Sequence, residues 1–401
     1  MFCKATIFMK KLIHILTAII TSVASVNANE LIQPADANFT SYVPLLKNQR
    51  VAIFANNASQ INGQNIVNAL LERKVNIVKI FSPEHGFSGL SDAGSEVANS
   101  QESNLQIISL YGKKDKPSVE DLNNVDIIVF DIQDVGVRYY TYISSLQKLM
   151  EAAAENNKPL IILDRPNPHA YYVDGPILEK KYKSFVGMQQ VPIVYGMTIG
   201  EYANMLVGEK WLDLKPKVKA QTLKLKIIPI TNYTHNSQYQ ITTRPSPNLP
   251  NMTAIYWYPS LGWFEGTQLS IGRGTAMPFQ VLGYPTFNTE FSFTPQPTAG
   301  AMNPPLIGQL CHGWDLQMSE SRAYQQTYGK IRLDYLISSY QEFPKKDKFF
   351  TSFFVKLAGT DLLRQQIIMG KSESEIRASW QNDLQQFKLI RAKYLLYPES
   401  N

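Results

Sequence analysis

Three apolar segments in the first half of the chain each end in a cluster of charged or polar residues. The segments and the residues that follow them are 75–81 with Glu84 and His85, 125–130 with Asp131, and 160–163 with Asp164. Apolar runs that alternate with helical patterns predict βαβ units and a mainly parallel sheet. Ligands of such sheets bind beyond the carboxyl ends of the strands. We therefore expect the three clusters to meet at one site, and this arrangement predicts an enzyme.

The rest of the chain extends this α/β pattern. Further strands are expected at 50–55 and 223–230. Helices are expected at 65–73, 119–122, 138–155, 198–207, 332–342, 346–358, 360–369 and 373–394. Two of these helices begin with a capping box, in which a Ser or Thr is followed three residues later by Glu. From about residue 284 the pattern changes to short strands and then helices, which predicts a second, smaller unit.

Residues 1–28 have the pattern of a secretory signal. Lys4, Lys10 and Lys11 precede an apolar stretch, and Ala28 fits a cleavage site. An uncleaved anchor is the alternative. Because the segment holds three of the 39 lysines and arginines and none of the 33 acids, the mature chain carries 36 against 33. This near balance, without basic runs, argues against nucleic-acid binding. We expect an exported protein, periplasmic or extracellular, with no membrane anchor after the signal is removed.

Glu84 and His85 lie between Pro83 and Gly86, in a sharp turn directly after an apolar strand. A carboxylic acid in a sheet-end pocket can have its pKa raised by desolvation, which suits a general acid. His85 could orient this acid or hold a second proton. A turn with an incidental Glu–His pair is the other interpretation.

The second cluster contains Asp131, Gln133 and Asp134, which could bind a metal, activate water or hold sugar hydroxyls. No DxDxDG loop is present, so no metal is expected, and hydrogen bonding to a polyhydroxylated ligand is favoured. Arg138, Tyr139 and Tyr142 follow. Arginine binds carboxylates in a fork, and tyrosine rings stack on sugar faces. Other candidates for substrate binding are Asp164, Arg165, Asn167, Asn248, Glu265 and Arg273.

Several longer motifs resemble one family. The segments FSPEHGF (81–87), FDIQDVGVRYYTY (130–142) and LDRPNP (163–168) resemble the NamZ-like exo-β-N-acetylmuramidases, formerly a domain of unknown function. The segments 174–176, 245–250, 261–267, 272–275, 357–360 and 379–380 are also similar. The resemblance runs from about residue 50 to 397. Residues 169–171 depart from the family pattern, which leaves the specificity of that loop open.

The resemblance implies a Rossmann-like domain, 29–283, joined to a smaller α+β auxiliary domain, 284–401. It implies an exo-acting glycoside hydrolase that releases N-acetylmuramic acid (MurNAc) from the non-reducing end of peptidoglycan fragments during cell-wall turnover. The expected partners are MurNAc–GlcNAc saccharides, and no cofactor is expected. The catalytic acid would be Glu84, with His85, Asp131 and Asp134 as the other catalytic candidates. The lactyl carboxylate of MurNAc would need a cation, for which Arg138, Arg165 and Arg273 are candidates.

The sequence leaves the second catalytic group and two rival functions open. A glycosidase normally uses two carboxyl groups, about 5–5.5 Å apart for retention or about 6.5–9.5 Å for inversion. The candidates are Asp131, Asp134, Asp164 and Glu265, and the acetamido group of the sugar could act instead. One rival is a non-catalytic cell-wall sugar-binding protein. The other is a peptidoglycan esterase or amidase with Ser82, Ser246 or Cys311 as its nucleophile.

Overall fold

The main sheet contains seven strands in the order β5-β6-β4-β1-β7-β8-β9 within the described residues, 31–102 and 105–399 of this computed structural model. The strands are β1 (Val51–Phe54), β4 (Ile77–Ser82), β5 (Ser100–Glu102), β6 (Leu105–Ser109), β7 (Ile127–Phe130), β8 (Leu160–Leu163) and β9 (Leu225–Ile228). All neighbouring pairs are parallel except β5 with β6 at one edge. A small hairpin, β2 (Gln60–Ile61) and β3 (Gln64–Asn65), lies outside this sheet.

The parallel strands follow the order of a doubly wound sheet. From β1 the chain adds β4 and β6 on one side, then returns to add β7, β8 and β9 on the other. Numbered along the chain, this is the order 3-2-1-4-5-6 of Rossmann-type folds. The reversal occurs between β1 and β7. Ligands of such folds bind outside the carboxyl ends of the strands near this reversal.

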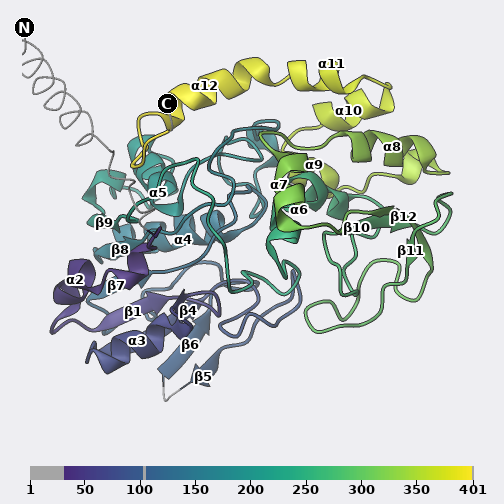
Figure 1. The fold of residues 1–401 in the computed structure, drawn as a ribbon. Coiled ribbons are helices and arrows are strands. Elements are labelled where there is room, and N and C mark those ends of the chain that lie inside the picture. The colour runs from purple at the N-terminus through teal and green to yellow at the C-terminus, as the bar shows by residue number, and fades with distance from the viewer. Residues whose placement is uncertain (1–30, 103–104, 400–401) are drawn as a thin grey trace, which may run out of the picture. The chain divides into compact units, whose positions relative to one another are not determined.

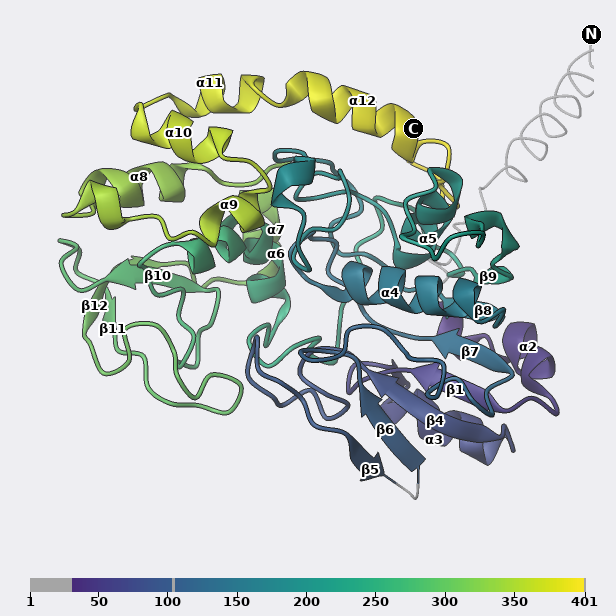
Figure 2. The same ribbon diagram turned by 180° about the vertical axis from the view of Figure 1, so that it is seen from behind.

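Helices cover both faces of the sheet because the strand side chains alternate between them. Val51 and Ile53 of β1 pack in one buried cluster with α3 (Ile66–Glu72). Ala52 and Phe54 belong to the other cluster, which includes α4 (Tyr142–Glu155) and α5 (Ile199–Gly208). Figures 1 and 2 show α3 and α4 on opposite sides of the sheet. The strands are therefore buried on both faces, which explains their continuous apolar runs.

A second, antiparallel sheet is built from the later part of the chain. It pairs β12 (Cys311–Asp315) with both β10 (Val281–Tyr284) and β11 (Ser292–Phe293). The helices of this part are α6 (Met252–Leu261), α7 (Glu320–Thr327), α8 (Asp334–Glu342), α9 (Phe354–Ala358), α10 (Leu362–Ile368), α11 (Glu373–Ala378) and α12 (Gln381–Arg391). The expected fold class is confirmed. The expected boundary at 283/284 falls inside β10 and stays a prediction.

The chain also forms several short helices. The α-helix α2 spans Phe39–Tyr42, and 3₁₀ turns occur at Ala35–Ala37, Val43–Leu46, Lys180–Tyr182, Ala220–Thr222, Gly262–Gly266 and Lys346–Lys348. The expected signal segment, 1–28, lies outside the described residues. In the part of the chain that is described, no helix is both long and apolar enough to cross a membrane.

Several sequence expectations about helices were wrong. Residues 119–122 form a turn, and the helix expected from 138 begins at Tyr142. Helix α6 was missed because every one of its residues is buried, so it has no polar face to create a helical period. The capping boxes of Thr198 with Glu201 and of Ser372 with Glu375 are confirmed.

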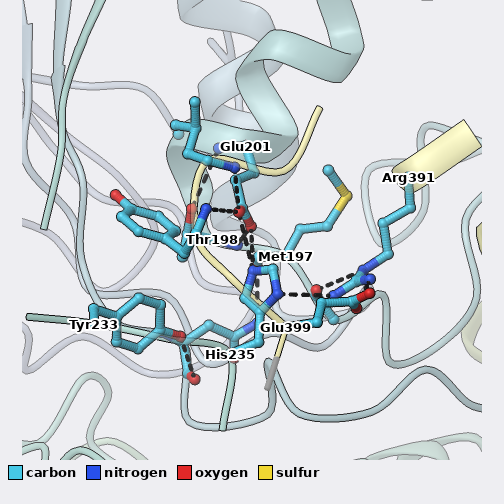
Figure 3. A network of polar contacts seen from close by, with 12 residues as sticks. Met197, Thr198, Glu201, Tyr233, His235, Arg391 and Glu399 are labelled. Carbon is cyan, nitrogen blue, oxygen red and sulfur yellow. Dashed lines mark hydrogen bonds and ion pairs between the residues drawn. The ribbon is translucent and has the colours of Figure 1, made fainter. Parts of the chain in front are cut away.

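The end of the chain is joined to α5 by a polar network, shown in Figure 3, whose members are buried except for Glu399. We call Glu201, His235, Arg391 and Glu399 the C-terminal clasp. Nε2 of His235 lies 3.0 Å from both carboxylate oxygens of Glu201. Arg391 bonds to Glu399, and its Nη2 donates to Nδ1 of His235 at 3.3 Å. Since Arg391 can only donate, the hydrogen on this ring is on Nε2, and it points to Glu201.

Candidate active site

A cavity of about 220 Å³ lies among the segments that follow β4 and β7. Its polar lining includes Glu84, His85, Thr141, Glu265 and Arg273. Its aromatic lining includes Tyr111, Tyr139, Tyr140, Tyr142, Tyr258, Phe279 and Phe353. Charged groups set among rings are the usual composition of a small-molecule site.

Glu84 reaches the cavity from the turn after β4 and is held at both carboxylate oxygens. Oε1 accepts a hydrogen bond from the backbone N–H of Gly94 at 2.8 Å. Oε2 accepts one from Oγ1 of Thr141 at 3.0 Å. The Tyr111 hydroxyl is a third neighbour, and its pKa is raised by burial and by the charge of Glu84. The carboxyl group is thus positioned at the cavity wall by three different segments.

The backbone of His85 adopts a positive φ, which is uncommon for residues other than glycine. Its φ is +68°, and Gly86 follows at +72°. Two left-handed residues in succession turn the chain sharply. Nδ1 of His85 donates to the carbonyl of Ser91 at 2.7 Å, which leaves Nε2 as the acceptor. Burial lowers the pKa of His85, partly offset by Glu84, so the ring is neutral at neutral pH.

Glu265 and Arg273 form an ion pair on another part of the cavity wall. Nε and Nη2 of Arg273 lie 2.8 and 2.7 Å from Oε1 of Glu265. The guanidinium also lies over the ring of Phe279, 5.1 Å from its centroid. Arg273 stands between two glycines with φ near +80°, and a Cβ on Gly272 would meet the Met277 carbonyl oxygen at 2.5 Å. Arg273 is the one Lys or Arg among the described residues that line the cavity.

The aromatic wall is rigid because its rings hold each other. Tyr258 packs edge-on against Tyr139 and Phe279, with centroids 5.5 and 4.8 Å apart. The hydroxyl of Tyr139 donates to the Pro259 carbonyl at 2.8 Å. A Cβ on Gly262 would lie 2.3 Å from the Tyr139 ring, so the glycine makes room for it. The hydroxyl of Tyr139 is therefore bonded to the main chain, and its ring forms part of the cavity wall.

The comparison with known families agrees with this site. Residues 51–253 match the family described as exo-beta-N-acetylmuramidase NamZ, N-terminal, and residues 256–397 match its C-terminal part. The chain belongs to this muramidase family. It is 36% identical over 384 residues to the peptidoglycan beta-N-acetylmuramidase NamZ of Bacillus subtilis (strain 168), covering 90% of each chain.

Two solved structures share the fold of this muramidase. Both are DUF1343 family proteins of Bacteroides fragilis NCTC 9343. One is 44% identical with a TM-score of 0.83, and the match covers 92% of this chain and 100% of that one. The other is 27% identical with a TM-score of 0.73, and the match covers 92% of this chain and 99% of that one.

The structure brings together only part of the set expected from the sequence. Six of the expected residues line the muramidase cavity, namely Glu84, His85, Tyr139, Tyr142, Glu265 and Arg273. Eight are not in its lining, namely Asp131, Gln133, Asp134, Arg138, Asp164, Arg165, Asn167 and Asn248. These eight are buried and make bonds within the protein.

Asp131 and Arg165 are part of a closed ionic triad. Nε and Nη2 of Arg165 bond to the two oxygens of Asp131 at 2.6 and 2.9 Å, and Nη2 also bonds to Asp36 at 2.5 Å. Burial raises the pKa of Asp36 to about 7, against the opposing effect of Arg165. A guanidinium already paired with two carboxylates is not free to hold a substrate carboxylate. The triad lies next to the point where the sheet order reverses, because Asp131 directly follows β7.

Asp134 and Asp164 are also buried and accept hydrogen bonds from other protein groups. Asp134 accepts from the Tyr195 hydroxyl and from the Gly136 N–H, and burial raises its pKa to about 6. Asp164 accepts from Thr198, Tyr397 and the Gly200 N–H, and burial raises its pKa to about 7. Both carboxylates thus connect segments of the chain by hydrogen bonds and do not line the cavity.

Arg138 is fully buried and bonds only to main-chain carbonyls. Its guanidinium donates to the carbonyls of Pro176, Val191 and Leu357 at 2.7–2.9 Å. Burial lowers its pKa to about 10. Because α4 begins at Tyr142, Arg138 precedes this helix and does not begin it. Arg138 joins three segments beside the cavity.

The side-chain amides of the remaining expected residues donate hydrogen bonds to main-chain carbonyls. Nε2 of Gln133 donates to the carbonyls of Asp134 and Pro166, Nδ2 of Asn167 to Met197 and Nδ2 of Asn248 to Gly300. Among the described residues, no group of three His, Cys, Asp or Glu side chains is placed to hold a metal ion.

The sequence analysis missed several residues of the lining, above all Tyr111 and Thr141. Thr141 lies inside the longest motif, and its hydroxyl could have been considered. Tyr111 directly follows β6 and Leu110, an apolar stretch that predicts a strand. Recognising that strand would have placed Tyr111 at the same sheet edge as Glu84.

Proposed function

We propose that this muramidase removes MurNAc from the non-reducing end of peptidoglycan fragments and that Glu84 protonates the leaving oxygen. The observation that carries the proposal is the placement of Glu84. Three of the four other candidate acids, Asp131, Asp134 and Asp164, are not in the cavity lining, whereas Glu84 is. General acid catalysis typically contributes roughly 10²–10⁴-fold.

The contacts of Glu84 indicate which oxygen carries the proton. The Gly94 N–H can only donate, so Oε1 must accept and cannot hold a proton in that direction. The Thr141 hydroxyl donates to one lone pair of Oε2, so a proton can be held on the other side of this oxygen, and the bond to Thr141 is kept whether Oε2 is protonated or ionised. Oε2 is therefore the atom that gives the proton to the glycosidic oxygen.

Glu265 is the best-placed second carboxyl group. Like Glu84, it lines the cavity, and Arg273 holds its Oε1 while the second oxygen is left for a reacting group. It could act on water or on the acetamido group of the sugar. Asp131 and Asp134 are not candidates for this role, because Asp131 is bonded to Arg165 and Asp134 is bonded to Tyr195 and Gly136.

The test uses chromogenic glycosides of MurNAc and GlcNAc, with an acetyl ester as control. Hydrolysis of the MurNAc glycoside is expected, whereas a sugar-binding protein would turn over none and an esterase would cleave only the ester. Glu84→Gln should lose roughly 10²–10⁴-fold on a natural disaccharide and less on an aryl glycoside, whose leaving group needs little protonation. Wild-type rates on both substrates would refute the role of Glu84.

We also propose that the protein is exported and cut after Ala28, as the pattern of residues 1–28 suggests. This would place the enzyme where peptidoglycan fragments arise. N-terminal sequencing of protein from the periplasm or medium should begin at Asn29, and a sequence that begins at Met1 would contradict the proposal.

A further inference from the structure

A second hollow lies on the other side of helix α6 from the catalytic cavity. Tyr258 lines the catalytic cavity, whereas Tyr256, two positions earlier, lines the second hollow. Successive helical residues are turned by about 100°, so these two rings leave α6 on nearly opposite sides. The hollow has a volume of about 460 Å³. We call it the tyrosine pocket.

The wall of this pocket belongs to a connected set of tyrosine rings. Tyr324 of α7 packs against Tyr256 and against Tyr328, with centroid distances of 5.3 Å in both pairs. Tyr328 in turn stacks on Tyr171, with the planes 10° apart, and is 56% exposed. Rings that hold each other in this way are already ordered, so a ligand can stack on them at little cost in conformational entropy.

The polar lining is rich in amides and poor in charge. Gln238, Gln240 and Gln325 contribute side-chain amides, and each amide can both donate and accept. Glu320 is the one charged side chain among the described residues of the lining, and it accepts a bond from Gln240 at 3.2 Å. Without a cation the pocket does not suit a phosphate or a carboxylate, and its exposed glutamine amides favour a ligand with hydroxyl or amide groups of its own. Ring faces with amides and no cation suit a neutral, polyhydroxylated molecule.

We propose that the tyrosine pocket is a binding site for neutral saccharide units, such as GlcNAc residues of a glycan, separate from the catalytic cavity. The pyranose ring stacks on Tyr324, which the buried Tyr256 holds in place, and the glutamine amides bond to hydroxyl and acetamido groups. The carboxylate of Glu320 disfavours acidic sugars. Binding here needs no catalysis. If the proposed function also holds, this site keeps a long fragment bound while its end is cleaved.

Calorimetric titration of the mature protein with the GlcNAc trimer tests the proposal. We expect a Kd below about 1 mM and a loss of at least about tenfold in Tyr324→Ala. Tyr324→Phe, which keeps the ring, should retain most of the affinity. Tyr182→Ala is the matched control, because Tyr182 is also half-buried and lines neither hollow. No binding of the trimer, or wild-type affinity in Tyr324→Ala, would overturn the proposal.

Two further readouts separate this site from the catalytic cavity. A hyaluronan tetrasaccharide, which carries carboxylates, should bind more weakly than the GlcNAc trimer, and Glu320→Gln should reduce this difference. Tyr324→Ala should hydrolyse a small MurNAc glycoside at the wild-type rate but show a several-fold higher KM for long fragments. Equal losses on both substrates would mean that Tyr324 acts through the catalytic cavity, against the proposal. Failure of the small-glycoside assay in the wild type would refute only the proposed function.

Discussion

Glu84 with His85 and Glu201 with His235 are two glutamate–histidine pairs with opposite surroundings. The first pair is adjacent in the sequence and lines a cavity. The second pair is 34 residues apart, fully enclosed, and joined to the end of the chain (Figure 3). Glu201 accepts bonds from His235 and from the backbone N–H groups of Thr198, Leu396 and Tyr397. The same two residue types are thus suited to catalysis where they line a cavity, and to stabilising the fold where protein groups surround them.

The sharpest test of this difference is Glu201→Gln beside Glu84→Gln. The amide nitrogen of Gln cannot accept, so Glu201→Gln breaks buried hydrogen bonds to a charged group and should lower the free energy of unfolding by at least about 1.5–3 kcal/mol. The protein that remains folded should keep its turnover per molecule. Urea unfolding and the MurNAc assay on the same samples measure both quantities.

Glu209→Gln is the matched control for that experiment. Glu209 caps the end of α5 and bonds to Lys393 and Tyr394, so it also ties the last segment to this helix, but near solvent. Exposed ion pairs contribute about 0–1 kcal/mol. If Glu209→Gln costs as much stability as Glu201→Gln, burial is not what distinguishes the clasp.

A second comparison concerns the arginines of the two regions. Arg273 of the cavity pairs with Glu265, and Arg391 of the clasp pairs with Glu399. If Arg273 recognises the lactyl carboxylate, Arg273→Ala should reduce the preference for MurNAc over GlcNAc glycosides by about 1.5–3 kcal/mol, or roughly 10–150-fold. Arg391→Ala should lower stability and leave this preference unchanged.

Loss of Arg273 also leaves the Glu265 carboxylate unpaired, and this charge would itself repel the substrate. The double variant Arg273→Ala/Glu265→Gln removes the repulsion. Because it also removes the second catalytic candidate, the preference is measured for every variant as the ratio of the Kd values for MurNAc and GlcNAc, not as hydrolysis. A preference restored to wild type in the double variant would show that Arg273 only neutralises Glu265. A preference that stays low supports direct recognition of the lactyl group.

The sequence predicted where polar residues leave the sheet but not which way they point. The strand ends at 81, 130 and 163 were placed to within a residue or two, and Glu84, at the first of them, lines the cavity. The acids directly after the other two ends are enclosed. The residues that bond to them come from distant segments. Arg165, which pairs with Asp131, also pairs with Asp36, and the hydroxyl of Tyr397 donates to Asp164. A pattern read along one segment does not contain these contacts.

A last test concerns Asp134, a carboxylate that is buried like that of Glu201 but bonds to Tyr195 and Gly136 rather than to a histidine. Burial raises its pKa from 3.8 to about 6, so between these values the folded chain holds a proton that the unfolded chain has released. Stability should therefore fall as pH rises through this range, by at most about 1.4 kcal/mol per pH unit from this group. Asp134→Asn removes this contribution, so between about pH 4 and pH 6 its stability should fall less, or rise more, than that of the wild type. Urea unfolding at about pH 4.5, 5.2 and 6.5 measures the two slopes. Identical slopes would mean that Asp134 is ionised throughout, and burial alone would then not distinguish the enclosed carboxylates from those of the cavity.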